Sequence, residues 1–276
     1  MDNTTSNIPL NNSLILAIVF SILTYGNTLK AEPLKLVANY WEPFTGETLL
    51  NKGVASDIVT SVLQRGGYDV SIDIQPWARA LHNVNLGIND GIIAIWRTKE
   101  RMEKIEFSNA YYINTLVFIK RRGQEIHFTS LKDLVGLHIG VGRGYAYTSE
   151  FDSADYLTKK PVVKLSQNLE KLALKRIDLV LSDQLIAMYY MNLRLENPEL
   201  NSDFEFIAPA MSQTPLYFGI SKKNPRHKEI IQQFNQFLSE IKSDGTYEGI
   251  FNRHGYAFDT NKSRVILPNL KKEFRY

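Results

Sequence analysis

Short apolar segments of strand length alternate with segments of helical period along the first part of the chain. Leu34–Asn39 and Tyr68–Ile74 are typical of strands, whereas Gly53–Gln64 carries apolar residues at helical spacing. Pro76–Leu86 is again helical in pattern, and Gly91–Trp96 is an apolar run of the kind found in a buried strand. The alternation predicts βαβ units around a largely parallel sheet.

A second alternating series follows the strand-like segment Thr115–Lys120. Its predicted elements are strands at Leu137–Val141, Val162–Leu165, Leu179–Leu181, Phe204–Ile207 and Leu216–Ser221, and helices at Asn168–Lys175, Gln184–Leu193 and Lys228–Lys242. The segment Gly245–His254 closes the series. A chain of 276 residues is long for one core and natural for two lobes. The predicted crossings between lobes, Thr115–Gly123 and Ala208–Tyr217, would form a two-strand hinge.

Composition excludes several classes of function. The net charge of +3 is weak and basic residues are interspersed with acidic ones, which argues against nucleic-acid binding. The absence of cysteine excludes disulfides, thiolate metal sites and a lipoprotein anchor. The five histidines show no metal-ligand spacing. We therefore expect neither a metal nor a cofactor.

The N-terminal segment resembles a leader. Leu14–Leu23 is an apolar run of ten residues, too short to span a bilayer and typical of a signal-peptide core. We predict a signal peptide over residues 1–31. Met1–Ser13 contains no Lys or Arg, which departs from the usual pattern, and an uncleaved anchor is the alternative.

Arg101 is the strongest candidate for ligand contact. Its guanidinium is a planar, permanently charged fork of donors that matches a carboxylate. Thr98 is placed to cap the short turn that carries it. The alternative is a surface arginine paired with Glu103 or Glu106.

A series of weak motifs occurs in a specific order. It comprises Trp41–Phe44, Gly53-x-x-x-Asp57, Trp77 to Asp90, Thr98-x-x-Arg101, Phe107-Ser108 with Tyr111-Tyr112, Leu131–Gly136, Gly140–Gly144, Ile177-Asp178 with Asp183, and Gly245–Gly255. In this order the chain, from Leu34 to Tyr256, resembles bacterial extracytoplasmic solute-binding proteins of family 3.

The resemblance implies an α/β, two-lobed periplasmic-binding-protein-like fold of type II. Two mostly parallel sheets, flanked by helices, would be joined by a two-strand hinge. Lobe 1 would comprise residues 32–118 and 217–256, and lobe 2 residues 119–216. Residues 257–276 would be a C-terminal tail.

The same resemblance implies roles for individual residues. Trp41 matches an aromatic residue that stacks on the ligand, and Arg101 matches the carboxylate clamp. The amides of Gly144 and Tyr145 match a loop at a helix N-terminus that binds the same carboxylate. Asp183 matches the acid that pairs with a ligand ammonium group. Its alternative role is the N-cap of the following helix.

Some positions depart from the family pattern. The segment Ala94–Arg97 replaces small hydroxyl residues, with Trp96 in uncertain register, and Tyr145 stands where Thr or Ser is expected. These aromatics, with Tyr147, favour a bulky or aromatic carboxylate ligand, and Trp96 is included in the predicted site. The alternative is that the aromatics only fill contacts between the lobes.

Other conspicuous residues are predicted to lie outside the site. Trp77 and the pair Tyr189-Tyr190 have apolar neighbours at helical spacing and are interpreted as core residues. Asp57 is interpreted as a surface or hinge-facing acid.

The predicted function is periplasmic binding of a small carboxylate-bearing solute, an amino acid or a related acid, by lobe closure. The protein would be a monomer without catalytic residues, and its partner would be a membrane permease or receptor. Two alternatives are an enzyme on the same scaffold, similar to cyclohexadienyl dehydratase with Asp183 or Glu150 as the acid, and a stand-alone ligand sensor.

Overall fold

The computed structural model describes residues 33–195, 204–259 and 264–266, with side chains described for 33–190 and 204–257. The strands are β1 (Leu34–Ala38), β2 (Val70–Ile74), β3 (Gly91–Ile95), β4 (Ile105–Phe107), β5 (Tyr112–Arg121), β6 (His138–Gly142), β7 (Thr158–Val162), β8 (Leu179–Asp183), β9 (Phe204–Ser221), β10 (Ala257–Asp259) and β11 (Arg264–Ile266). The helices are α2 (Val54–Arg65), α3 (Trp77–Leu86), α4 (Lys99–Lys104), α5 (Ser149–Asp152), α6 (Leu165–Ala173), α7 (Gln184–Leu195), α8 (His227–Ser243) and α9 (Thr246–Arg253), with short 3₁₀ helices at Leu50–Lys52 and Leu131–Leu134.

The predicted signal peptide lies outside the described residues. Among the described helices, none has the length and apolar character that a membrane crossing needs.

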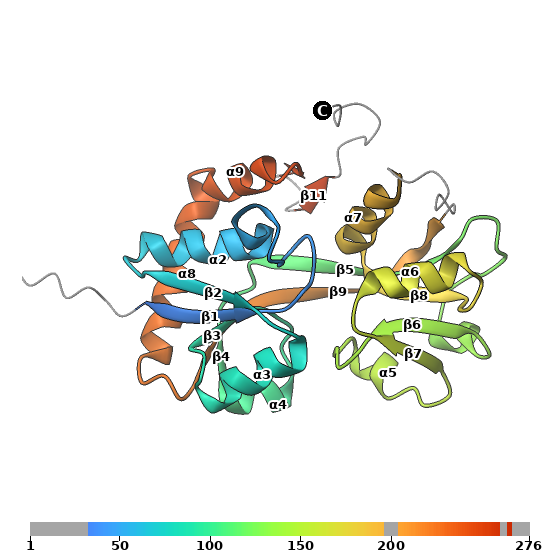
Figure 1. Ribbon diagram of the computed structural model, residues 1–276, viewed down its shortest axis with the longest axis horizontal. Helices are drawn as coiled ribbons and strands as arrows, with labels where there is room; N and C mark the ends of the chain where they lie inside the picture. Colours follow the sequence, from blue (N-terminus) through green and yellow to red (C-terminus); the bar gives the residue numbers. More distant parts are fainter. Residues whose placement is uncertain (1–32, 196–203, 260–263, 267–276) are drawn as a thin grey trace, which may run out of the picture. The chain divides into compact units, whose positions relative to one another are not determined.

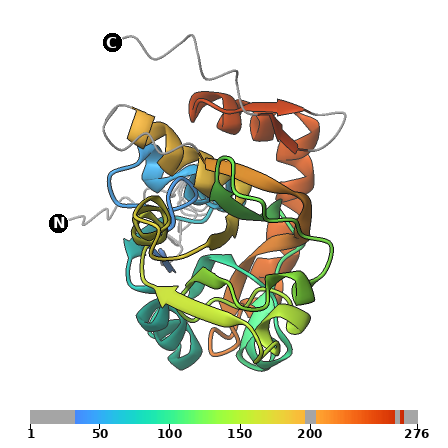
Figure 2. The same cartoon turned by 90° about the vertical axis from the view of Figure 1, so that its right-hand side faces the viewer.

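Nine strands join in one mixed sheet, in the order β2-β1-β3-β9-β5-β8-β6-β7, with β4 paired to β9 (Figure 1). The first strand group comprises β1, β2, β3 and β4. Strand β1 pairs in parallel with β2 and β3, whereas β3 and β4 pair antiparallel with the C-terminal end of β9. The second strand group, β8, β6 and β7, is parallel and meets β5 in antiparallel pairing. The long strands β5 and β9 pair with each other and connect the groups. Figure 2 shows the side on which β7 lies, in yellow-green.

Alternating side chains of β1 explain why helices cover both faces of the first strand group. Leu36 packs in one core cluster with Ile58 of α2. Its neighbour Val37 points to the other face and packs with Ala80 and Val84 of α3. The two helices accordingly lie on opposite sides of β1 (Figure 1). This buries the apolar stripe of each helix and brings the start of α3 to the carboxyl end of β2.

The buried carboxylate of Asp57 ties α2 to the end of α9. Asp57 is 5% exposed, and its carboxylate accepts hydrogen bonds from Arg253 Nε at 2.7 Å and Nη2 at 3.0 Å. His254 Nε2 lies 2.9 Å from the same carboxylate, and Asn51 Nδ2 donates to it at 3.1 Å. Burial raises the pKa of Asp57, but the hydrogen bonds from His254, Arg253 and Asn51 outweigh it, so the pKa falls to about 2. The interpretation of Asp57 as a surface or hinge-facing acid is wrong.

Three segments differ from the expected elements. The two strands predicted around Phe204–Ser221 are one strand, whose register against β5 shifts between Leu116 and Phe118. β7 is Thr158–Val162 rather than Val162–Leu165, and α6 begins at Leu165. Part of the expected tail forms the antiparallel pair β10–β11. The predicted lobe boundaries stay a prediction.

Candidate ligand-binding site

Arg101 is carried by the short helix α4, which begins directly after β3. The Thr98 side chain accepts a hydrogen bond from the Arg101 amide at 3.2 Å, so the predicted cap is present. The Arg101 residue is only 9% exposed. Within the part of the chain that the structure describes, neither Glu103 nor Glu106 pairs with it. The arginine therefore does not match the alternative of a surface ion pair.

The Arg101 guanidinium is held by neutral groups. Its Nη1 donates to the Trp96 carbonyl at 2.7 Å, and its Cζ lies 4.9 Å from the centre of the Trp77 ring. No carboxylate among the described residues lies within ion-pair distance of it, and Glu100 and Asp152 act from farther away. Burial lowers the pKa of Arg101. A buried cation without a paired anion is unfavourable, so this position favours an anionic ligand.

The guanidinium lines a cavity, called here the Arg101 cavity, with about 270 Å³ of open space including its solvent side. The residues that line it are Asn39, Trp41, Trp77, Ala94, Trp96, Arg101, Tyr145, Ala146 and Leu216. Four of the predicted site residues, Trp41, Trp96, Arg101 and Tyr145, are thus brought together. They come from both strand groups.

Aromatic rings form most of the wall of this cavity. Trp41 and Trp96 meet edge to face with centroids 5.6 Å apart, and Tyr145 lies 5.9 Å from Trp96 and 6.1 Å from Trp41. The Trp96 ring is fixed by its Nε1, which donates to Asn114 Oδ1 at 2.8 Å. These aromatic rings therefore contact one another and also line the cavity. The geometry thus agrees in part with each predicted role, contact with the ligand and packing between the predicted lobes. An apolar wall beside one charge suits a ligand with a carboxylate and a flat or apolar body.

The loop around Gly144 differs from what the resemblance implied. Gly144 has φ of +73° and its carbonyl accepts a hydrogen bond from Trp77 Nε1 at 3.2 Å. The Tyr145 amide donates to the Gly142 carbonyl at 3.3 Å. Helix α5 begins only at Ser149 and is capped by Thr148. The binding of an anion by the Gly144 and Tyr145 amides stays a prediction, without the helix N-terminus on which it was based.

Asp183 caps helix α7. Its Oδ1 accepts hydrogen bonds from the amides of Leu185 at 2.9 Å and Ile186 at 3.2 Å. Its Oδ2 accepts from Asn114 Nδ2 and from the Thr115 amide, both at 3.0 Å. Burial raises the pKa of Asp183 to about 6, although these hydrogen bonds oppose the rise. This geometry favours the N-cap alternative, and ammonium binding by Asp183 stays a prediction.

Asp183 lines a second cavity, called here the Asp183 cavity, with about 460 Å³ of open space including its solvent side. Trp41, Trp96 and Tyr145 line both cavities, whereas Arg101 lines only the first. The described residues contain no group of three histidines or acids placed to hold a metal ion.

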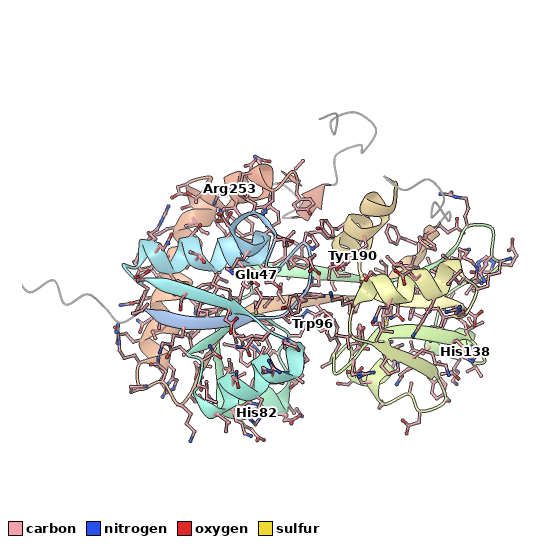
Figure 3. All side chains as sticks on the ribbon, viewed as in Figure 1. Glu47, His82, Trp96, His138, Tyr190 and Arg253 are labelled. Atoms are coloured by element: carbon pink, nitrogen blue, oxygen red, sulfur yellow. The ribbon has the colours of Figure 1, made fainter. Side chains whose placement is uncertain are left out.

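Two residues interpreted as core side chains belong to the cavities. Trp77 is half-buried at the start of α3 and lines the Arg101 cavity. Tyr190 lines the Asp183 cavity, and its hydroxyl donates to Glu42 Oε2 at 2.5 Å. Figure 3 shows Tyr190 and Trp96 near the middle of the view, and Arg253 near α2 and α9. The position of Trp77 directly after a strand, at the edge where parallel sheets bind ligands, was the signal that could have identified it.

Solved structures share this architecture. An ancestral arginine-binding protein bound to arginine superposes with a TM-score of 0.65 at 24% identity, covering 79% of this chain and 96% of that chain. The fold is that of the type II periplasmic binding proteins. At this level of identity the likeness describes the fold alone.

Sequence comparison defines the family. The model of the bacterial extracellular solute-binding proteins, family 3, matches residues 36–257, and the chain belongs to this family. A probable histidine-binding protein of Campylobacter jejuni is 26% identical over 73% of this chain and 76% of its own length. A putative ABC transporter arginine-binding protein 2 of Escherichia coli is 28% identical over 56% of this chain, and this chain spans 61% of that relative. These relatives are named as binding proteins, which favours binding over the dehydratase-like alternative.

Proposed function

We propose that the protein binds a small carboxylate-bearing solute, an amino acid or a related acid, with Arg101 as the group that binds the carboxylate. The observation that carries this proposal is the buried guanidinium of Arg101, which has no carboxylate within ion-pair distance among the described residues. A ligand carboxylate would supply the missing charge. Inside a cavity of low dielectric constant that pairing is stronger than in water.

Contacts between the two strand groups support a mechanism of closure around the ligand. Trp77 of α3 reaches the Gly144 carbonyl beyond β6, and Tyr190 of α7 reaches Glu42 beyond β1. Trp77 lines the Arg101 cavity and Tyr190 lines the Asp183 cavity, so both contacts lie beside the candidate site. We infer that the ligand favours the arrangement in which these contacts are made, because it binds that arrangement more tightly than an open one.

The site of action and the partner are inferred from the family. The family description is extracellular, and the related proteins are named for amino acids and for an ABC transporter. With the leader predicted over residues 1–31, these names support a periplasmic protein that delivers its ligand to a membrane permease.

A thermal-shift screen tests the proposal. The purified protein is heated with a panel of carboxylates, each paired with its neutral primary amide. A ligand present at 100 times its dissociation constant adds about 2.7 kcal/mol to the free energy of unfolding. We expect at least one carboxylate to raise the melting temperature while its amide does not. Equal stabilisation by carboxylates and amides would contradict a role for the Arg101 charge.

A further inference from the structure

Three aromatic residues, Trp41, Trp96 and Tyr145, line both the Arg101 cavity and the Asp183 cavity. The only charged side chain on the wall of the first cavity is Arg101, and the only one on the wall of the second is Asp183, as far as the described residues go. A ligand bound at Arg101 would therefore contact these rings, while Asp183 lies on the wall of the other cavity.

The Tyr145 ring is held in this position from several sides. Besides Trp41 and Trp96, it meets Trp77 edge to face with centroids 6.4 Å apart. Its hydroxyl accepts a hydrogen bond from Asn39 Nδ2 at 3.4 Å. A Cβ atom on Gly142 would lie 2.7 Å from the ring, so the glycine at this position gives the ring its space. These contacts hold the Tyr145 ring in one position on the wall that the two cavities share.

The Asp183 carboxylate, which lines the second cavity, has no vacant position for a further hydrogen-bond donor. An ionised carboxylate offers about four lone-pair sites. The Asp183 carboxylate already accepts four hydrogen bonds, from the Leu185 and Ile186 amides, the Thr115 amide and Asn114 Nδ2. It is therefore satisfied by the protein itself, in contrast to the Arg101 guanidinium.

An α-ammonium group on the ligand would be unfavourable in the Arg101 cavity. It lies next to the carboxylate that Arg101 binds, and hence close to the guanidinium, with which it shares the sign of its charge. No acid lines that cavity among the described residues, so the aromatic ring faces would be the main attraction for an ammonium group there, against the repulsion from the guanidinium.

We propose that Tyr145 is a specificity-determining residue, which separates Arg101 from Asp183 and so selects carboxylates with a planar apolar body and no α-ammonium group. This inference rests on the proposed function and narrows its ligand class. Aromatic and arylalkanoic acids have the required chemistry.

Two probes that differ only in the ammonium group test it. 3-Phenylpropanoate and L-phenylalanine share the ring and the carboxylate, and their dissociation constants are measured by calorimetry near pH 7. For the unchanged protein we expect 3-phenylpropanoate to bind at least about tenfold more tightly. In Tyr145→Ala, which joins the two cavities and admits water and the Asp183 charge, we expect this ratio to fall by about tenfold.

Tyr145→Phe is the matched control, because it keeps the ring and removes only the hydroxyl. It should keep the ratio of the unchanged protein. Tyr145→Thr replaces the alanine variant if that variant does not fold, and the same fall in ratio is expected. An equal ratio in the unchanged protein and in the folded small-residue variant would overturn the inference, as would tighter binding of L-phenylalanine by the unchanged protein.

Arg101→Gln separates this inference from the proposed function. Loss of both probes in Arg101→Gln, with an unchanged ratio in Tyr145→Ala, would overturn the role of Tyr145 and leave Arg101 as the carboxylate-binding group. Binding of both probes undiminished in Arg101→Gln would overturn the proposed function and this inference with it.

Discussion

Two buried charged side chains of this protein differ in how their charge is compensated. Asp57, between α2 and the end of α9, is paired with Arg253 and hydrogen-bonded to His254. Arg101 is buried to a similar degree, yet its guanidinium donates to a carbonyl and lies over the Trp77 ring without a carboxylate partner among the described residues. The first charge is satisfied within the fold, whereas the second has no carboxylate within ion-pair distance among the described residues. This difference in compensation, rather than in burial, is why we propose a structural role for Asp57 and a ligand-binding role for Arg101.

The largest expected effect is on stability. Removing one partner of a buried pair typically costs 3–5 kcal/mol, and because Arg253 is partly exposed we expect about 3 kcal/mol for Asp57→Ala. Arg101→Gln removes an unpaired buried charge and should change the free energy of unfolding by less than about 1 kcal/mol, or raise it. Urea denaturation measures both. An equal loss in the free energy of unfolding in the two variants would contradict the proposed difference between Asp57 and Arg101.

A second prediction concerns pH and compares Asp57 with Asp183. The pKa of Asp57 is lowered to about 2, so its contribution to stability, about 2 kcal/mol, is present above its unfolded pKa of 3.8 and is lost as the pH falls through 2. The pKa of Asp183 is raised to about 6, so its contribution, about 3 kcal/mol, is present below 3.8 and is lost as the pH rises through 6.

Asp183→Asn isolates the second of these contributions, since asparagine still caps a helix but does not ionise. Between pH 4 and pH 7 the unchanged protein should lose stability relative to this variant, measured by denaturation at each pH. Parallel curves over this range would contradict the raised pKa of Asp183.

The smallest effect is expected for a contact between the strand groups. Tyr190→Phe removes the hydroxyl that donates to the Glu42 carboxylate, and a hydrogen bond to a charged group contributes about 1.5 kcal/mol or more. Because we propose that this contact belongs to the closed arrangement, we expect ligand affinity to fall by about tenfold. Tyr189→Phe, which leaves that hydrogen bond in place, is the control in the same calorimetric titration. An equal loss of affinity in both variants would argue against a role in closure.

Local patterns predicted most elements of the fold because burial imposes a clear period on the sequence. They failed where polar residues or proline interrupt that period. Phe204–Ile207 and Leu216–Ser221 were predicted as two strands, whereas a register shift against β5 accommodates Pro209 within one strand. In β7 the half-buried Lys159 and the exposed Lys160 concealed the strand.

The site was predictable only in part. The Thr98 cap follows from local sequence and is confirmed by the structure, whereas ligand binding by Arg101 was predicted mainly from the family resemblance and stays a prediction. The role of Trp77 does not follow from local sequence, because its apolar neighbours at helical spacing are those of a core residue, and only the tertiary structure brings its ring to Arg101. The four donors to the Asp183 carboxylate come partly from β5, far away in sequence, and could not be predicted from local spacing.

The most direct test of Arg101 uses a neighbouring arginine as the control. Arg97 also stacks on aromatic rings, with its Cζ 4.2 Å from the centre of Tyr217, but it is exposed and does not line the Arg101 cavity. Calorimetry with the most stabilising carboxylate of the thermal-shift screen compares Arg101→Gln with Arg97→Gln. We expect affinity to fall by about a hundredfold or more in Arg101→Gln and to stay within about threefold in Arg97→Gln. Affinity within threefold of the unchanged protein in Arg101→Gln would contradict the assignment of Arg101 as the carboxylate-binding group.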